Sequence, residues 1–137
     1  MPKNLLVSLG AAFFVVYGVA FILAPTAMAS FVTGAAPTHP TSMIDFRATY
    51  GGMTLGVGLI LAICARTPAY SRLGLQSLAI AMGAMATGRV VGIVLDGEPN
   101  AMMFIYLALE FVVLALSLLG LRGDSDPRGR ESDQENG

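Results

Sequence analysis

The sequence predicts an all-α fold, an integral membrane four-helix bundle with both termini in the cytoplasm. Three observations carry this prediction. Of the 137 residues, 55% are hydrophobic and 12% are charged, whereas about a quarter of the residues in a soluble domain are charged. The mean hydropathy is +0.69, and four apolar runs each approach the roughly 20 residues that cross a bilayer core about 30 Å thick. Finally, outside these runs Lys and Arg lie before the first run, at the second connection and after the last run, and are absent from the first and third connections.

Polar and helix-breaking residues set the limits of the four apolar runs. We expect membrane-spanning helices over residues 5–23, 43–65, 73–95 and 101–121. Together they form one domain, residues 1–122, because a soluble arrangement could not hide so much apolar surface behind so few polar faces. Residues 123–137 are charged and rich in Gly and Ser without an apolar period, so we expect a disordered acidic tail in the cytoplasm.

The basic residues predict how the chain is threaded through the bilayer. They precede the first span, flank the second connection and follow the last span, as Lys3, Arg66, Arg72 and Arg122. The first and third connections contain neither Lys nor Arg. Under the positive-inside rule, both termini and the second connection are cytoplasmic. We therefore expect a multi-pass protein of the plasma (inner) membrane.

The first span also has a reading as a cleavable signal peptide. Lys3 precedes an apolar run, and Ala27-Met28-Ala29 before Ser30 resembles a cleavage site. The run is about 19 residues long, however, and the apolar region of a signal peptide is about 7–15. We therefore expect the first helix to be retained.

Two shorter patterns lie in the first connection. Residues 25–32 carry Met28, Phe31 and Val32 at helical spacing, which predicts a short helix lying at the membrane interface. Ser42-x-x-Asp45 matches a capping box, which predicts the start of the second span.

Arg89 and Glu110 are the two charged residues placed deepest in the predicted spans. Leaving an Arg unpaired near the bilayer centre costs about 2.5–3.5 kcal/mol. Arg89 lies about 9 Å from the outer end of its span and Glu110 about 14 Å from the outer end of the next, at 1.5 Å per residue. Because helical side chains lean towards the N-terminus, the two lean towards each other. We therefore expect an intramembrane charge pair, serving either as a structural clasp between helices or as the charged floor of a ligand pocket or proton path.

Four further residues are candidates for the rim of an outer-half pocket or for plain packing. Arg47 and Tyr50 share one helix face, where Arg47 can also snorkel to the interface as an anchor. Asp96 falls seven residues after Arg89 and can face the same side, although Asp96-Gly97-Glu98-Pro99 also reads as an ordinary turn. Tyr106 stands one turn before Glu110, where it could hydrogen-bond the carboxylate or serve as an interfacial tyrosine.

Two GxxxG motifs predict close helix packing. They are Gly52 with Gly56 in the second span and Gly88 with Gly92 in the third. Such spacing lets helix backbones approach each other. We therefore expect the second span to pack against the third.

The composition excludes several classes of function. Cys64 is the one cysteine, which excludes a disulfide and a CxxC pair, and His39 is the one histidine, which excludes a multi-histidine metal site. There is no basic stripe for nucleic acid. We expect no metal, no cofactor and no catalytic residue.

Three motifs occur in order along the chain: Arg47-x-x-Tyr50-Gly51-Gly52, Gly88-Arg89-x-x-Gly92 and an intramembrane Glu110. In this the chain resembles an uncharacterised family of small four-helix bacterial membrane proteins, domain of unknown function 4345, which is distantly similar to DoxX-like membrane proteins. The resemblance covers nearly the whole chain except the acidic tail. It implies an integral four-helix bundle and brings no reaction, cofactor or partner.

Three classes of function remain open. The first is a binding or accessory module whose outer-half polar site holds a lipid, a quinone-like ligand or a partner membrane protein. The second is a small proton-coupled transporter component in which Glu110 titrates, although the sequence has no inverted repeat. The third is a membrane enzyme, which ranks last because no nucleophile–base arrangement is visible. The lipid bilayer is a partner in all three, and a homo-oligomer is left open.

Overall fold

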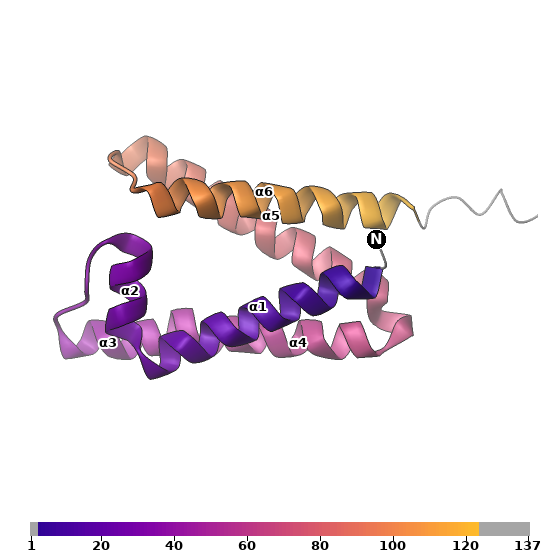
Figure 1. Ribbon diagram of the computed structural model, residues 1–137, viewed down its shortest axis with the longest axis horizontal. Coiled ribbons are helices and arrows are strands. Elements are labelled where there is room, and N and C mark those ends of the chain that lie inside the picture. The colour runs from indigo at the N-terminus through magenta and orange to yellow at the C-terminus, as the bar shows by residue number, and fades with distance from the viewer. Residues whose placement is uncertain (1–2, 124–137) are drawn as a thin grey trace, which may run out of the picture.

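The computed structural model describes residues 3–123, and in this range the chain is helical with no strand (Figure 1). The helices follow one another with short connections: α1 (Lys3–Leu23), α2 (Pro25–Thr33), α3 (Pro40–Phe46), the π-helical η1 (Arg47–Met53), α4 (Thr54–Arg66), the 3₁₀ turn η2 (Pro68–Tyr70), α5 (Ser71–Asp96) and α6 (Ala101–Arg122).

Four of the helical stretches are long and apolar enough to cross a membrane. They are Asn4–Leu23, Pro40–Arg66, Pro68–Asp96 and Ala101–Arg122. This confirms the all-α fold class with four candidate membrane-spanning helices. The second span is built from α3, η1 and α4 in continuous succession. The side of the membrane on which the termini lie stays a prediction, and the predicted acidic tail lies, apart from Gly123, outside the described residues.

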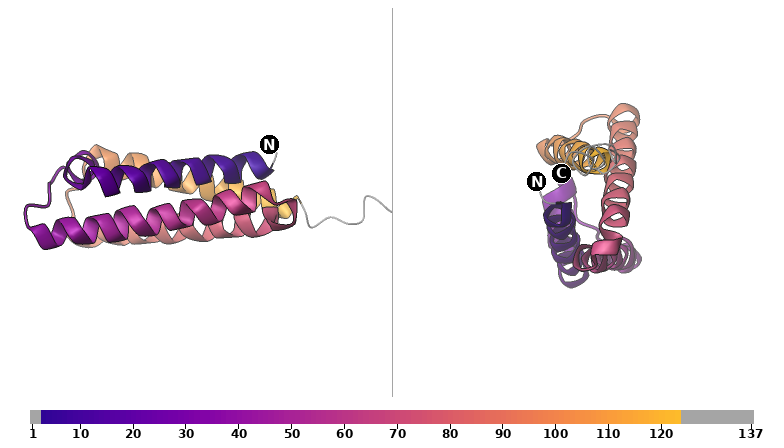
Figure 2. Two further views of the ribbon diagram at one scale, coloured as in Figure 1. Left: turned by 90° about the horizontal axis from the view of Figure 1, so that it is seen from below. Right: turned by 90° about the vertical axis from the view of Figure 1, so that its right-hand side faces the viewer.

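The four spans form two antiparallel pairs. α1 packs along η1 and α4, and α5 packs along α6, while α5 and α4 share a smaller contact. Seen end-on in Figure 2, α5 runs along one side of the bundle from α6 to α4, and α1 and α6 lie on the opposite side. At one end the pairs diverge and α2 lies between them, in contact with both α1 and α6 (Figure 1). We call this the α2 end, and the opposite end, which carries the start of α1 and the end of α6, the terminal end.

The two ends contain separate clusters of buried side chains. The terminal-end cluster joins three helices through apolar side chains: Leu6, Val7, Ala11 and Phe14 of α1, Leu61 and Cys64 of α4, and Leu75, Leu78 and Met82 of α5. The α2-end cluster is built on Phe21, Ala29 and Val32, with aromatic and methionine side chains packed around them. The candidate site lies beside this second cluster.

Three glycines make the close contact between α1 and the second span. A Cβ atom on Gly18 would lie 2.6 Å from the backbone nitrogen of Leu55, and one on Gly58 would lie 2.7 Å from that of Val15. Gly51 is equally tight against Ile22, at 2.6 Å from its Cγ1. Glycine is therefore required here because two helix backbones touch.

The predicted packing role of Gly52, Gly56, Gly88 and Gly92 is wrong. A Cβ atom on Gly56 or Gly88 would meet nothing within 4 Å, and on Gly52 or Gly92 it would meet an atom of its own helix. The GxxxG spacing places two glycines on one face but does not say which way that face points. The second span turns its other glycines, Gly51 and Gly58, to α1, so its main partner is α1 rather than the third span.

Of the two predictions made for the first connection between the spans, the structure confirms one. The predicted helix over residues 25–32 is present as α2, which ends where Gly34 adopts a left-handed conformation with φ of 80°. The predicted capping box is wrong, since α3 begins at Pro40 and Ser42 lies within it. His39 caps the helix instead, with Nδ1 accepting from the Thr41 backbone N–H at 3.3 Å. Proline at the first helical position favours this earlier start, because it lacks the N–H that would be unpaired there.

Candidate functional site

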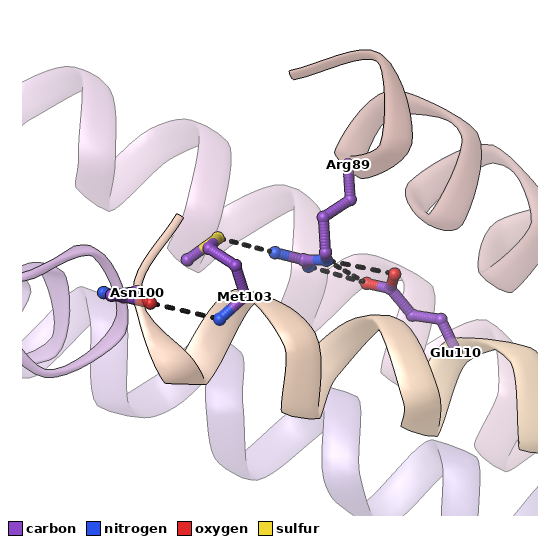
Figure 3. Close-up of polar contacts among 4 residues, drawn as sticks. All are labelled: Arg89, Asn100, Met103 and Glu110. Carbon is purple, nitrogen blue, oxygen red and sulfur yellow. Dashed lines mark hydrogen bonds and ion pairs between the residues drawn. The ribbon is translucent and has the colours of Figure 1, made fainter. Parts of the chain in front are cut away.

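Arg89 of α5 and Glu110 of α6 form a two-pronged ion pair inside the bundle (Figure 3). The Nη2 group donates to Oε1 at 2.6 Å, and Nε donates to Oε1 at 3.2 Å and to Oε2 at 3.1 Å. The side chains are 17% and 5% exposed. The α5–α6 hairpin, with its short connection, brings the two helices into register so that the opposed side chains meet. Paired arginine and carboxylate in this fork geometry are strong charge-assisted partners.

Two side chains of α6 complete the surroundings of the guanidinium. Arg89 Cζ lies 5.3 Å from the centre of the Tyr106 ring, within range of a cation–π interaction. Its Nη1 group donates to Met103 Sδ at 3.1 Å (Figure 3). Met103, Tyr106 and Glu110 recur at intervals of three and four residues, so α6 presents all three on one face. Sequence reasoning had placed Tyr106 here but missed Met103.

Tyr17 of α1 extends the site to the other helix pair. Its ring lies 6.4 Å from that of Tyr106 in an edge-to-face arrangement. It also contacts Phe13 and Phe21 of its own helix, at 5.6 Å and 5.0 Å between ring centres. Phe13, Tyr17 and Phe21 are spaced four residues apart, which is the signal by which the sequence could have revealed this aromatic face.

Asn100 joins α2 to the first turn of α6. Its Oδ1 accepts from the backbone N–H of Met103 at 3.1 Å and so caps α6. Its Nδ2 donates to the carbonyl of Val32 in α2 at 3.2 Å. The Asn100 side chain thus links α2 to the first turn of α6, which carries the Met103 side chain that contacts Arg89.

Two of the predicted rim residues, Arg47 and Tyr50, lie next to the polar centre, where the second span meets the end of α1. Arg47 Nη1 donates to the carbonyl of Ile22, in the last turn of α1, where a cation complements the negative end of the helix dipole. Tyr50 stacks against Phe46 at 4.9 Å and Phe21 at 5.4 Å between ring centres. Arg47 and Tyr50 therefore hold the second span to the end of α1, and Phe21 connects them to Tyr17.

Asp96 does not join the pair. It is exposed at the last position of α5, with its Oδ2 directed towards Gly92 of the same helix. The structure thus brings Arg89, Glu110 and Tyr106 together, adds Met103 and Tyr17, and places Asp96 outside. Within residues 3–123, no three His, Cys, Asp or Glu side chains come close enough to hold a metal ion.

The fold and this site define a small multi-pass membrane protein with a salt-bridged polar centre at one end of its bundle. The family described as Domain of unknown function (DUF4345) matches residues 3–121, and the chain belongs to that family. Neither the curated proteins nor the solved structures contain a match to the chain. The distant similarity to DoxX-like membrane proteins stays a prediction.

Proposed function

We propose that this protein is a membrane-embedded binding module whose ligand site is the polar centre formed by Arg89 and Glu110 with Met103, Tyr106 and Tyr17. Ionisable residues within membrane spans commonly mark sites of binding or transport, because their burial is costly. The proposal names a role that goes beyond holding two helices together.

The proposal rests on one observation: the Arg89 Nη1 group donates only to a weak hydrogen-bond acceptor. Glu110 uses the other side of the guanidinium, through Nε and Nη2. Nη1 meets a thioether sulfur, which is a weak acceptor. Methionine is flexible and easily displaced. A ligand oxygen in place of the sulfur would give this nitrogen a stronger hydrogen bond while the ion pair stayed intact.

The ion pair alone would be enough to hold α5 and α6 together, but more side chains surround it than this structural role requires. A clasp requires two helices, and α5 and α6 supply both charges. Tyr17 approaches from α1, and α2 is bonded across the end by Asn100. Two further chain segments, α1 and α2, thus converge on a pair that belongs to α5 and α6. Convergence of a few polar groups among apolar and aromatic ones is typical of small-molecule sites.

Mass spectrometry of small molecules that co-purify in mild detergent from native membranes tests the proposal. The comparison variant combines Arg89→Leu with Glu110→Gln, which removes both charges and leaves neither one unpaired. Thr87→Val is the matched control, because Thr87 is exposed on α5 and its hydroxyl bonds its own helix at Gly83.

We expect one species to remain with the wild type and with Thr87→Val and to fall by about tenfold or more in the double variant. Loss of a hydrogen bond to a charged group, about 1.5–3 kcal/mol, corresponds to at least that factor. Identical small-molecule profiles for all three proteins would reject the binding role.

A further inference from the structure

We infer that the ligand is an uncharged amphiphile with a carbonyl or hydroxyl head at Arg89 Nη1 and one apolar chain in a groove along α1. This inference rests on the proposed function and specifies its ligand class. It is carried by three observations: the charge of the centre, its depth and the groove that meets it.

The charge of the centre favours an uncharged head. Arg89 and Glu110 neutralise each other at 2.6 Å, and Met103, Tyr106 and Tyr17 around them add no charge. An anionic head would approach the Glu110 carboxylate, and a cationic head would approach the guanidinium. A neutral oxygen acceptor meets neither repulsion and still accepts from Nη1. The aromatic walls, Tyr106 and Tyr17, suit a head with a flat or apolar body.

The depth of the polar centre also favours an uncharged head. Arg89 lies seven positions before Asp96, the end of α5, which is about 10 Å at 1.5 Å per residue. Tyr17 lies six positions before Leu23, the end of α1, at a similar depth of about 9 Å. A charged phospholipid head stays at the membrane interface, whereas a small neutral head can descend to this level.

The groove runs along α1 and meets the polar centre at Tyr17. It is lined by apolar side chains and the Tyr17 ring, with one residue contributed by α2: Ala12, Phe13, Val16, Tyr17, Ala20 and Met28. Its volume of about 490 Å³ falls within the roughly 300–1,000 Å³ of small-molecule sites. Tyr17 also touches Tyr106, and Tyr106 lies under the Arg89 guanidinium, so the Tyr17 ring belongs both to the groove and to the polar centre.

The groove is open from the side of the bundle. Val16 and Phe13 on its wall are 69% and 46% exposed, and both lie on a helix that crosses the hydrocarbon region. The end of the bundle is covered by α2, which Asn100 ties to α6. A ligand therefore reaches the centre laterally from the bilayer, with its chain entering beside α1. Charged water-soluble molecules lack this route.

Photolabelling locates the chain directly. The probe is a fatty alcohol with a diazirine near the end of its chain, and the comparison probe is the fatty acid of the same length, ionised at pH 8. The full chain is reconstituted in lipid nanodiscs, illuminated and digested, and labelled residues are identified by tandem mass spectrometry. We expect the alcohol to label α1 between Ala12 and Ala20, and excess unlabelled alcohol to compete. The ionised acid should label this segment at least about tenfold less.

Two substitutions on α1 form a matched pair. Ala20→Trp fills the groove, whereas Val19→Trp puts the same side chain at an exposed position beside it that does not line the groove. We expect labelling of α1 to fall by about tenfold or more in Ala20→Trp and to change less than about twofold in Val19→Trp. Should Ala20→Trp not fold, the labelled positions in the wild type and the alcohol–acid contrast decide alone.

The outcomes separate this inference from the proposed function. If labelling depends on the Arg89 and Glu110 charges but falls on helices other than α1, the groove is not the site of the apolar chain. The proposed binding role of the polar centre is then unaffected. A co-purified ligand with a charged head overturns the uncharged class and likewise leaves the site. Equal, non-competed labelling of all four spans by both probes overturns the inference, and when native profiles are also unchanged by the double variant, the binding role fails with it.

Discussion

The two ends of this bundle are built by different means. The terminal-end cluster is closed by apolar, mainly aliphatic, side chains from three helices, with Val7, Leu61, Leu75 and Leu78 fully buried. The α2 end holds the ion pair and a connected set of five aromatic rings, with its helices spread apart and a short helix between them. Neither end is stabilised by expulsion of water in the ordinary way, because lipid is as apolar as leucine. The terminal end is thus held by packing, and the α2 end by specific polar and aromatic contacts.

This contrast teaches where tolerance to substitution lies. A packed end responds to changes of volume and is indifferent to ligands. An end held by paired polar groups responds to changes of charge, and its contacts can be exchanged for those of a ligand. Four predictions order these responses from the largest to the smallest.

The largest effect belongs to the ion pair of the α2 end. Glu110→Gln or Arg89→Leu alone leaves the other charge buried without its partner, which we expect to cost about 3–5 kcal/mol. The double variant should recover much of that loss, because the two residues are coupled. Reversible unfolding in detergent measures all three. Single variants within about 0.5 kcal/mol of the wild type would show that the pair does not hold the helices together.

The second effect tests packing with two glycines of one helix. Gly58→Ala puts a Cβ atom 2.7 Å from the Val15 backbone nitrogen, so the backbones must separate. We expect a loss of about 1–3 kcal/mol, as for overpacked cores. Gly56→Ala is the control, with nothing within 4 Å of the new atom. It should gain up to about 1 kcal/mol from its better helix propensity. Equal losses in both would mean that the tight α1–α4 contact is absent.

How far the sequence could predict this molecule depends on the range of the interaction. The four spans follow from local apolar length, and the meeting of Arg89 with Glu110 follows from the cost of burying either alone in a short hairpin. The direction of a glycine face is set by helices far away in the chain, so both GxxxG motifs pointed to the wrong contact.

The same limit applies to the rest of the site. Tyr17 reaches Tyr106 across the two helix pairs, over a sequence distance that no local pattern records. Arg47 reads as a snorkelling side chain or a pocket rim in the sequence, whereas in the fold it bonds the carbonyl of Ile22 at the end of α1. Long-range pairings of this kind depend on how α1 packs against the second span.

The third effect concerns the exchangeable contact of the guanidinium. Met103→Leu removes the thioether from Arg89 Nη1 but leaves Glu110 paired. We expect a change in unfolding free energy below about 1.5 kcal/mol, typical of a volume-conserving substitution. Retention of the co-purified ligand should be kept or increased, because the ligand oxygen no longer competes with sulfur. Mass spectrometry of the purified variant measures this, and loss of the ligand at unchanged stability would show that Met103 itself forms the binding surface.

The smallest effect is expected at the tie between α2 and α6. Asn100→Ala removes the cap of α6 and the bond to the Val32 carbonyl, at a cost of about 1 kcal/mol. Asn100→Asp separates these two roles, because aspartate still caps the helix but cannot donate to Val32. Hydrogen exchange at the backbone amides of α2 is the measurement. Both variants should exchange faster there while the terminal-end amides around Leu75 keep their protection, since the two clusters share no member. Faster exchange at both ends would show that the bundle opens as one unit, and the distinction between a packed end and an exchangeable end would be lost.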